Sequence, residues 1–179
     1  MSINDVLNFW FKELSPSDWF KKDARIDQDI RDRFSSLWLK ASRGELASWR
    51  ETKEGRLAEI IVLDQFSRNL HRESKKAFQN DELALKLAEE MVNLGLDKEL
   101  RPEQRAFVYL PYVHSEKMEF HFRAEELLSA AGLMENLDYE RKHRVILEKF
   151  GRYPHRNKIL GRKSTPAEVQ FLKGPDSSF

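Results

Sequence analysis

The sequence predicts an all-α protein: a single domain with about seven to nine helices. Of its 179 residues only seven are Gly and six are Pro, so residues that break helices are few. Apolar residues recur at spacings of three and four, which is the period of an amphipathic helix. No stretch alternates apolar and polar residues as a half-buried strand does.

Capping residues and periodicity delimit the individual helices. Ser2 and Asp5 have the spacing of a capping box and begin a first helix, which the segment around Pro16 ends. A second capping box, formed by Thr165 and Glu168, begins a short last helix. Helical periodicity predicts the others at residues 26–42, 52–68, 81–93, 102–131 and 137–150.

Proline and glycine set the remaining boundaries. Pro111 lies inside the segment 102–131 and is expected to break or kink it, because proline lacks the amide hydrogen that a helix interior uses. Residues 174–179 combine Gly, Pro and Ser and are predicted to form a loose tail. The predicted domain is therefore residues 1–173.

Composition excludes several kinds of site. The chain has no Cys, so disulfides, Cys-ligated zinc, iron–sulfur clusters and cysteine nucleophiles are excluded. No apolar run approaches the roughly eighteen residues that span a bilayer, and no targeting segment is visible. We therefore expect a cytoplasmic protein with no membrane partner.

The net charge of +1 averages over two regions of opposite sign. Residues 141–163 hold nine Lys and Arg against one acid, Glu148, which gives this segment a charge of +8. The other 156 residues hold 22 basic and 29 acidic side chains, a charge of −7. The sequence thus predicts an acidic helical body that carries a basic C-terminal segment.

All four Trp residues fall within the first fifty positions, among several Phe residues. Aromatic side chains dominate protein cores, so this cluster predicts close packing of the first helices. An aromatic ligand pocket is the alternative interpretation.

Polar residues interrupt the apolar stripe of the segment 52–68. At 100° per residue, Asp64 and Arg68 fall on the stripe around Ile61 and form an i,i+4 pair in the favourable direction. Gln65 and Asn69 lie beside them. Because a charged pair at apolar positions is costly unless it is partnered, these residues form either a buried ion pair or the floor of a pocket.

The segment 102–131 is predicted to carry a similar anomaly, with Glu116 on its apolar stripe. His114 lies about 160° around a straight helix from Glu116, so the two are poor joint metal ligands unless the kink reorients His114. His114 and His121 share a face but lie two turns apart. No metal site is predicted, and His143 is expected to be a core or boundary residue.

The densest set of chemically capable residues follows the helix 137–150. It contains Arg152, His155, Arg156, Asn157 and Arg162. Arginine binds carboxylate or phosphate bidentately, histidine exchanges protons near neutral pH, and the N-terminus of the last helix attracts anions. Three interpretations stay open: a structural lock in which the arginines bridge to Asp64 or Glu116, an anionic ligand site, and a solvated surface.

Motif residues along most of the chain resemble one known family. The stretches are FWF at 9–11, LAEIIVLDQFSRN at 57–69, YLPYVHSE at 109–116, FGRYPHRN at 150–157 and the residues around Gly161. They resemble the largely bacterial family known as domain of unknown function nine hundred and twenty-four. The resemblance implies an all-helical fold similar to tetratricopeptide-repeat proteins, with antiparallel helix pairs stacked around a concave face. It supplies no activity or cofactor, and no internal repeat is visible here. Ser67 replaces a Pro common in the family, so the third helix is expected to continue further.

We expect a binding module whose polar pocket takes a peptide or a small anionic ligand. The candidate ligand-binding residues are Asp64, Gln65, Arg68, Asn69, Arg152, Arg156, Asn157 and Arg162. The alternative is an enzyme acting on an anionic small molecule, with His114, Glu116 and His155 as candidate catalytic residues. RNA binding by the basic segment is a third hypothesis without a module signature, so nucleic acid is not the expected partner. No cofactor is predicted, and the oligomeric state stays open.

Overall fold

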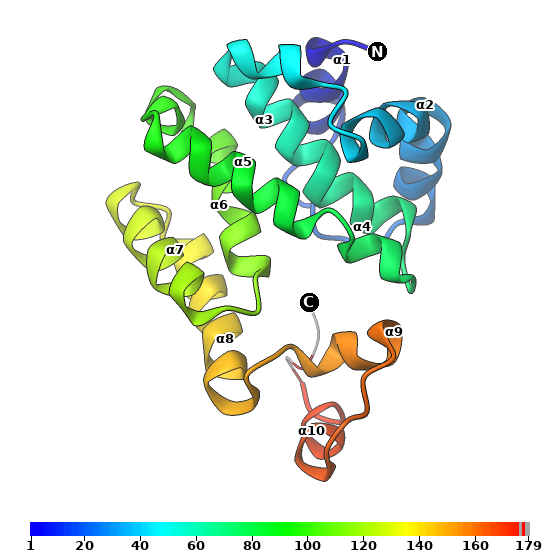
Figure 1. Cartoon of the computed structure of the whole chain (residues 1–179), viewed down its shortest axis with the longest axis vertical. Helices are drawn as coiled ribbons and strands as arrows, with labels where there is room; N and C mark the ends of the chain where they lie inside the picture. Colours follow the sequence, from blue (N-terminus) through cyan, green and yellow to red (C-terminus); the bar gives the residue numbers. More distant parts are fainter. Residues whose placement is uncertain (176, 178–179) are drawn as a thin grey trace.

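The computed structural model describes residues 1–175 and 177, which form helices and turns and contain no strand (Figure 1). The predicted all-α class is confirmed. The α-helices are α1 Ile3–Asn8, α2 Ala24–Ser42, α3 Lys53–Ile61, α4 Ser67–Leu70, α5 Asp81–Asn93, α6 Pro102–His114, α7 Met118–Ala130, α8 Met134–Phe150, α9 Asn157–Leu160 and α10 Pro166–Phe171. The predicted tail, 174–179, falls partly outside the described residues.

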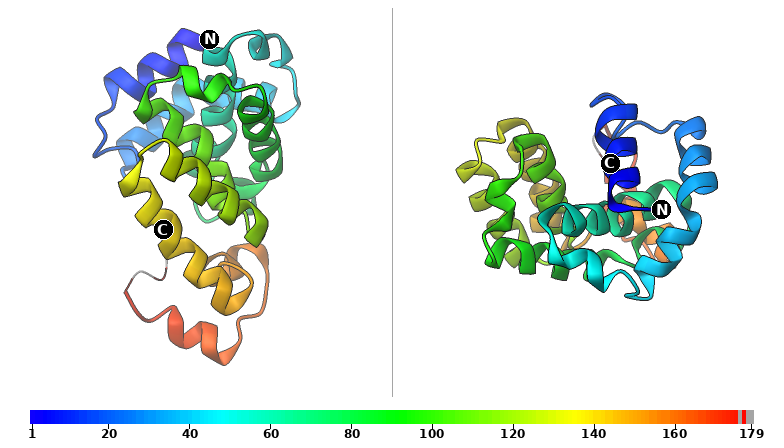
Figure 2. Two further views of the ribbon diagram at one scale, coloured as in Figure 1. Left: turned by 90° about the vertical axis from the view of Figure 1, so that its left-hand side faces the viewer. Right: turned by 90° about the horizontal axis from the view of Figure 1, so that it is seen from above.

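Consecutive helices from α5 to α8 pack against one another and are joined by short connections (Figures 1 and 2). Connections this short reverse the chain, so these neighbours are antiparallel. Helix α3 contacts α1, α5 and α6 and links the first helices to the later ones. After α8 the chain turns into a C-terminal segment that lies at the opposite end of the molecule from the N-terminus (Figure 1).

Aromatic side chains of the first helices form much of the core. The ring centroids of Phe9, Phe34 and Phe66 lie 4.9–6.1 Å from one another. Trp10 is fully buried and its ring lies 5.6 Å from that of Phe107 on α6. This part of the aromatic cluster is therefore packing, the first of the two interpretations drawn from the sequence.

The predicted third helix is continuous but not regular. Between α3 and α4 the residues Val62–Phe66 form a π-helical turn, η3. A π turn holds an extra residue per turn and rotates the side chains that follow it, so positions counted at 100° per residue are displaced beyond it. Asp64 lies within this turn, and such turns occur frequently at functional sites.

The predicted helix 102–131 is two helices, and the break is not at Pro111. Helix α6 continues through Pro111 to His114, and the chain becomes extended at Ser115, with φ −67° and ψ 145°. The expectation that Glu116 lies on an apolar helical stripe is therefore wrong. Glu116 lies in the connection between α6 and α7, where its side chain can turn toward the C-terminal segment.

Candidate functional site

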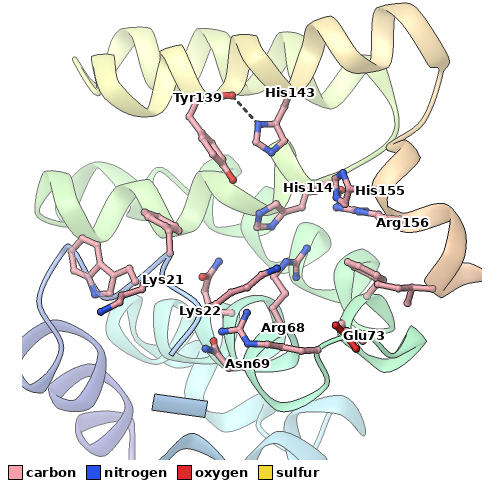
Figure 3. A pocket seen from close by; sticks show the side chains of 17 residues that line it. Lys21, Lys22, Arg68, Asn69, Glu73, His114, Tyr139, His143, His155 and Arg156 are labelled. Atoms are coloured by element: carbon pink, nitrogen blue, oxygen red, sulfur yellow. Dashed lines mark hydrogen bonds between the residues drawn. The ribbon is translucent and has the colours of Figure 1, made fainter. Parts of the chain in front are cut away.

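A pocket of about 370 Å³ lies between the helical body and the C-terminal segment (Figure 3). Its lining comes from the loop before α2, the turns on either side of α4, the end of α6, helix α8 and the segment after α8. The lining residues are Trp19, Phe20, Lys21, Lys22, Gln65, Arg68, Asn69, Arg72, Glu73, Ala77, Phe78, His114, Tyr139, His143, His155, Arg156 and Ile159.

His114 and Asp64 form a buried pair at the base of the pocket. The His114 Nδ1 lies 2.7 Å from the Asp64 Oδ1, and Asp64 is 1% exposed. Although burial alone raises the pKa of Asp64, Arg68 and His114 outweigh it and hold that pKa below its ordinary value. Burial and Arg68 lower the pKa of His114 against the opposing effect of Asp64, so the imidazole is neutral at pH 7.

This pairing fixes the tautomer of His114. An ionised carboxylate only accepts hydrogen bonds, so the His114 Nδ1 carries the proton and donates it to Asp64. The Nε2 is then an acceptor, and it forms no hydrogen bond with any residue that the structure describes. His114 therefore presents an oriented acceptor at the pocket wall.

Arg68 connects the pair to a second carboxylate. It lies 3.0 Å from the Asp64 Oδ1 and donates bidentately to Asp81, over 3.0 and 3.2 Å. Asp81 also lies 3.5 Å from Arg156 of the C-terminal segment. Two arginines and two carboxylates thus join α4, α5, α6 and the C-terminal segment in one network.

Arg156 is the most deeply placed cation of the C-terminal segment. It is 7% exposed, and its guanidinium carbon lies 4.7 Å from the ring centroids of both Phe78 and Tyr153. It donates to the carbonyl of His114 over 2.9 Å, whereas its buried Nε has no hydrogen-bond partner among the described residues. Burial lowers the pKa of Arg156, although Asp81 opposes this shift. An incompletely compensated buried guanidinium favours an anion beside it.

Two further histidines lie beside His114. Tyr139 and His143 point into the pocket from α8, and His155 enters from the C-terminal segment (Figure 3). The His143 Nδ1 donates to the Tyr139 carbonyl over 2.8 Å. Burial lowers the pKa of His143 to about 2, and burial with Arg156 lowers the pKa of His155 to about 4. The pocket therefore holds three neutral imidazoles at pH 7.

Cations also line the outer part of the pocket. Arg72 donates to both oxygens of Asp27, over 2.5 and 2.8 Å, and Asn69 donates to the same carboxylate over 2.8 Å. Lys21 is mostly exposed and only loosely paired, 4.0 Å from Asp23. Lys22 has no ion pair with any residue in the described part of the chain.

The other predicted site residues anchor the C-terminal segment outside the pocket lining. Arg162 donates bidentately to Glu116, over 2.6 and 2.9 Å, and Glu116 also accepts from the Tyr153 amide. Arg152 donates bidentately to Glu168, and Asn157 accepts from Arg162 over 2.9 Å. These contacts have the geometry of the proposed lock.

The pairing partners differ from those expected. No arginine of the C-terminal segment pairs with Asp64 within the described residues, because Arg68 and His114 already occupy it; Arg156 pairs with Asp81 instead. The N-terminus of the last helix is also occupied, since the Thr165 amide donates to Glu168 over 2.7 Å. That terminus is therefore not open to an external anion.

Sequence reasoning named six of the lining residues and missed the rest. Gln65, Arg68, Asn69, His114, His155 and Arg156 line the pocket, whereas Arg152, Asn157, Arg162 and Glu116 do not, and Asp64 lies behind His114. His143 was expected in the core and is 2% exposed, yet it also lines the pocket. Trp19 and Phe20 show that the aromatic cluster has a pocket side as well as a core side. Within the described residues no group of three or more His, Asp and Glu side chains is arranged to hold a metal ion.

The family follows from a comparison with known sequences. The family model described as bacterial protein of unknown function, DUF924, matches residues 6–176. The chain belongs to this family. No curated protein matches the chain.

A solved structure that is similar to this chain in sequence has the same fold. It is described as a protein of unknown function, ATU0120, from Agrobacterium tumefaciens, and is 40% identical in sequence. The match covers 96% of this chain and 97% of that one, with a TM-score of 0.91. No helix in the described part of this DUF924 protein is both long enough and apolar enough to cross a membrane.

Proposed function

We propose that this DUF924 protein binds a small anionic ligand in the pocket between its helical body and its C-terminal segment. The observation that carries the proposal is Arg156, a buried cation at the pocket wall whose Nε has no partner among the described residues. Lys22 is a further cation of the lining, and it forms no ion pair with any described residue. Both side chains can donate charge-assisted hydrogen bonds to a bound anion.

The dimensions favour a small molecule over a peptide. A volume of about 370 Å³ lies near the lower end of small-molecule pockets. Side chains of the helical body and of the C-terminal segment line it from opposite sides, including Tyr139 on α8 and Ile159 on α9. An extended peptide needs an open groove along which successive residues can lie. The cytoplasm stays the proposed location.

Thermal stabilisation by small anions tests the proposal, because a ligand that binds only the folded state raises Tm. The probes are acetate, citrate, inorganic phosphate and benzoate, each added at constant ionic strength. We expect at least one probe to raise the Tm of the wild-type protein. Arg156→Gln removes the buried cation and should abolish that rise.

Arg152→Gln is the matched control, because Arg152 belongs to the same segment and pairs with Glu168 outside the pocket. We expect this variant to retain the wild-type response to the anion. The proposal fails if no probe raises Tm, or if Arg152→Gln and Arg156→Gln lose the response equally. If both variants also lose most of their stability, the lock is the main role of these arginines.

The Asp64–His114 pair favours acid–base catalysis as a second candidate function. A neutral imidazole held by a carboxylate, with its other nitrogen facing a pocket, is suited to take a proton from water or substrate. Hydrolysis of the 4-nitrophenyl monoester of succinic acid is a direct test. Water forms the new bond to the acyl carbon, the nitrophenolate leaves, and His114 passes the proton from water to it.

The catalytic candidate predicts hydrolysis faster than in buffer and a loss of about a hundredfold or more in His114→Gln. His71→Gln is the matched control, because His71 is a partly buried histidine outside the pocket lining. Equal rates for the wild type, His114→Gln and His71→Gln would contradict catalysis of this reaction by His114.

A further inference from the structure

We propose that the ligand of this pocket is an aromatic monocarboxylate whose ring carries a hydroxyl or amine that donates a hydrogen bond to the His114 Nε2. This inference rests on the proposed function and names the chemical class of its ligand. Three independent features of the pocket define the three parts of that ligand: its single charge, its planar ring and its donor.

The charge balance among the described residues of the pocket favours a ligand with one negative charge over a ligand with two. Five cations line it, namely Lys21, Lys22, Arg68, Arg72 and Arg156. Four carboxylates oppose them: Asp27 pairs with Arg72, Asp64 and Asp81 pair with the other arginines, and Glu73 lines the pocket itself. The partly buried Asp23, 4.0 Å from Lys21, brings the number of described carboxylates to five, so the described charges balance. A monoanion therefore fits better than the dianion of a phosphate monoester.

The walls of the pocket suit a planar ring. Trp19 and Phe20 line it from the loop before α2, Phe78 from the turn after α4 and Tyr139 from α8. The Phe20 and Tyr139 rings are nearly parallel, at 27° with centroids 6.3 Å apart, so these two walls have similar orientations. Aromatic side chains bind rings by offset or edge-to-face contact and add specificity beyond burial alone.

The His114 side chain requires the ligand to carry a hydrogen-bond donor. Its Nδ1 proton is committed to Asp64, so the Nε2 can only accept. Arg68, Arg156 and Lys22 supply donors alone, so a ligand acid group satisfies them and leaves the histidine acceptor for a different group. A ring hydroxyl or amine meets that acceptor.

Calorimetric titration of the wild-type protein with a matched series of probes tests each part. The probes are 3- and 4-hydroxybenzoate, benzoate, cyclohexanecarboxylate, acetate and inorganic phosphate. We expect one hydroxybenzoate to bind about three- to tenfold more tightly than benzoate, because it adds one hydrogen bond. Benzoate should bind more tightly than the non-planar cyclohexanecarboxylate, and acetate and phosphate should be the weakest.

Variants assign the donor contact to His114. His114→Leu should lower the affinity for the hydroxybenzoate more than the affinity for benzoate, so that the difference between the two probes is lost, whereas His71→Leu should preserve the difference. If His114→Leu does not fold, the relative affinities of the probes for the wild-type protein still test the inference. Phosphate binding as tight as that of the best hydroxybenzoate, or benzoate binding no better than acetate, would overturn this inference and leave anion binding intact. No binding of any probe at about 10 mM would overturn both proposals.

Discussion

At the residue scale, burial and neighbouring charges determine which side chains around the pocket are ionised. Asp64 stays ionised because Arg68 and His114 compensate it, whereas burial holds the pKa values of His143 and His155 well below the ordinary value of histidine. Perturbed pKa values of this kind, gathered in one concave region, are typical of functional sites. They also make the stability of the fold depend on pH in a specific direction.

His143 gives the clearest prediction of pH dependence. Its pKa is about 2 in the folded chain, against 6.5 for an unperturbed histidine, so the unfolded state binds the proton more readily. The stabilisation is complete above pH 6.5 and is lost as the pH falls toward 2. Between pH 7 and pH 5 the free energy of unfolding should therefore fall by about 2 kcal/mol on account of this residue.

Urea unfolding at both pH values checks this expectation. His143→Gln should reduce the fall by about the same 2 kcal/mol, because glutamine does not titrate. Lys142→Gln, at the exposed neighbouring position, is the control and should retain the wild-type slope, since lysine ordinarily titrates far above this range. An unchanged slope in His143→Gln would show that this histidine is not kept neutral by folding.

At the element scale, irregular turns place the site residues. The π turn Val62–Phe66 carries Asp64 and Gln65, and the break at Ser115 frees Glu116 to bind Arg162. Close backbone approach matters as well. A Cβ atom added to Gly55 in α3 would lie 1.9 Å from the Trp49 carbonyl oxygen of the preceding 3-10 turn, so this helix–turn contact requires glycine.

Gly55→Ala should therefore destabilise the protein. In an ordinary helix interior the change stabilises by about 1 kcal/mol, because alanine has the higher helix propensity. Here the clash with backbone that cannot move aside should reverse the sign and cost about 1–3 kcal/mol. Glu54→Ala, at the exposed adjacent position, is the control, and unfolding midpoints in urea are the measurement. A stabilised Gly55→Ala protein would contradict the close approach.

The periodicity of apolar residues predicted most of the longer helices but not these irregular turns. The segments 26–42, 81–93 and 137–150 carry strong apolar stripes and were predicted nearly as they occur. Pro111 was an incorrect signal, because the helix tolerates it and ends three residues later at His114, before a Ser with no strong breaking tendency. Arg68 and Arg156 were found because charged residues at apolar or motif positions are unusual. Lys22 and Phe78 were missed, since they reach the pocket from loops whose course depends on tertiary packing.

At the scale of the whole molecule, the uneven charge distribution has a structural counterpart. The basic segment folds onto the acidic body, where Arg162 meets Glu116 and Arg156 meets Asp81. Tyr153 adds a donated hydrogen bond of 2.6 Å to the Val113 carbonyl. The same segment therefore pairs with the body through Arg162 and contributes Arg156 to the lining of the pocket.

The variant Glu116→Gln tests whether Glu116 holds the C-terminal segment against the helical body. It removes the charge that Arg162 binds while keeping an acceptor for the Tyr153 amide, and both ionic side chains are only 25% exposed. We expect a loss of about 1–2 kcal/mol in the free energy of unfolding and faster hydrogen exchange in residues 151–165. Glu126→Gln breaks the exposed pair with Arg123 and should cost less than about 0.5 kcal/mol. Equal effects would contradict a lock at Glu116.

The most direct test of the central claim is to locate a bound anion. Crystals grown with 3-bromo-4-hydroxybenzoate would show the bromine by its anomalous scattering. We expect a peak inside the pocket beside Tyr139, with the carboxylate within hydrogen-bond reach of Arg156 and the hydroxyl within reach of the His114 Nε2. A pocket without such a peak, in crystals where bromine is found only at surface positions, would contradict the account.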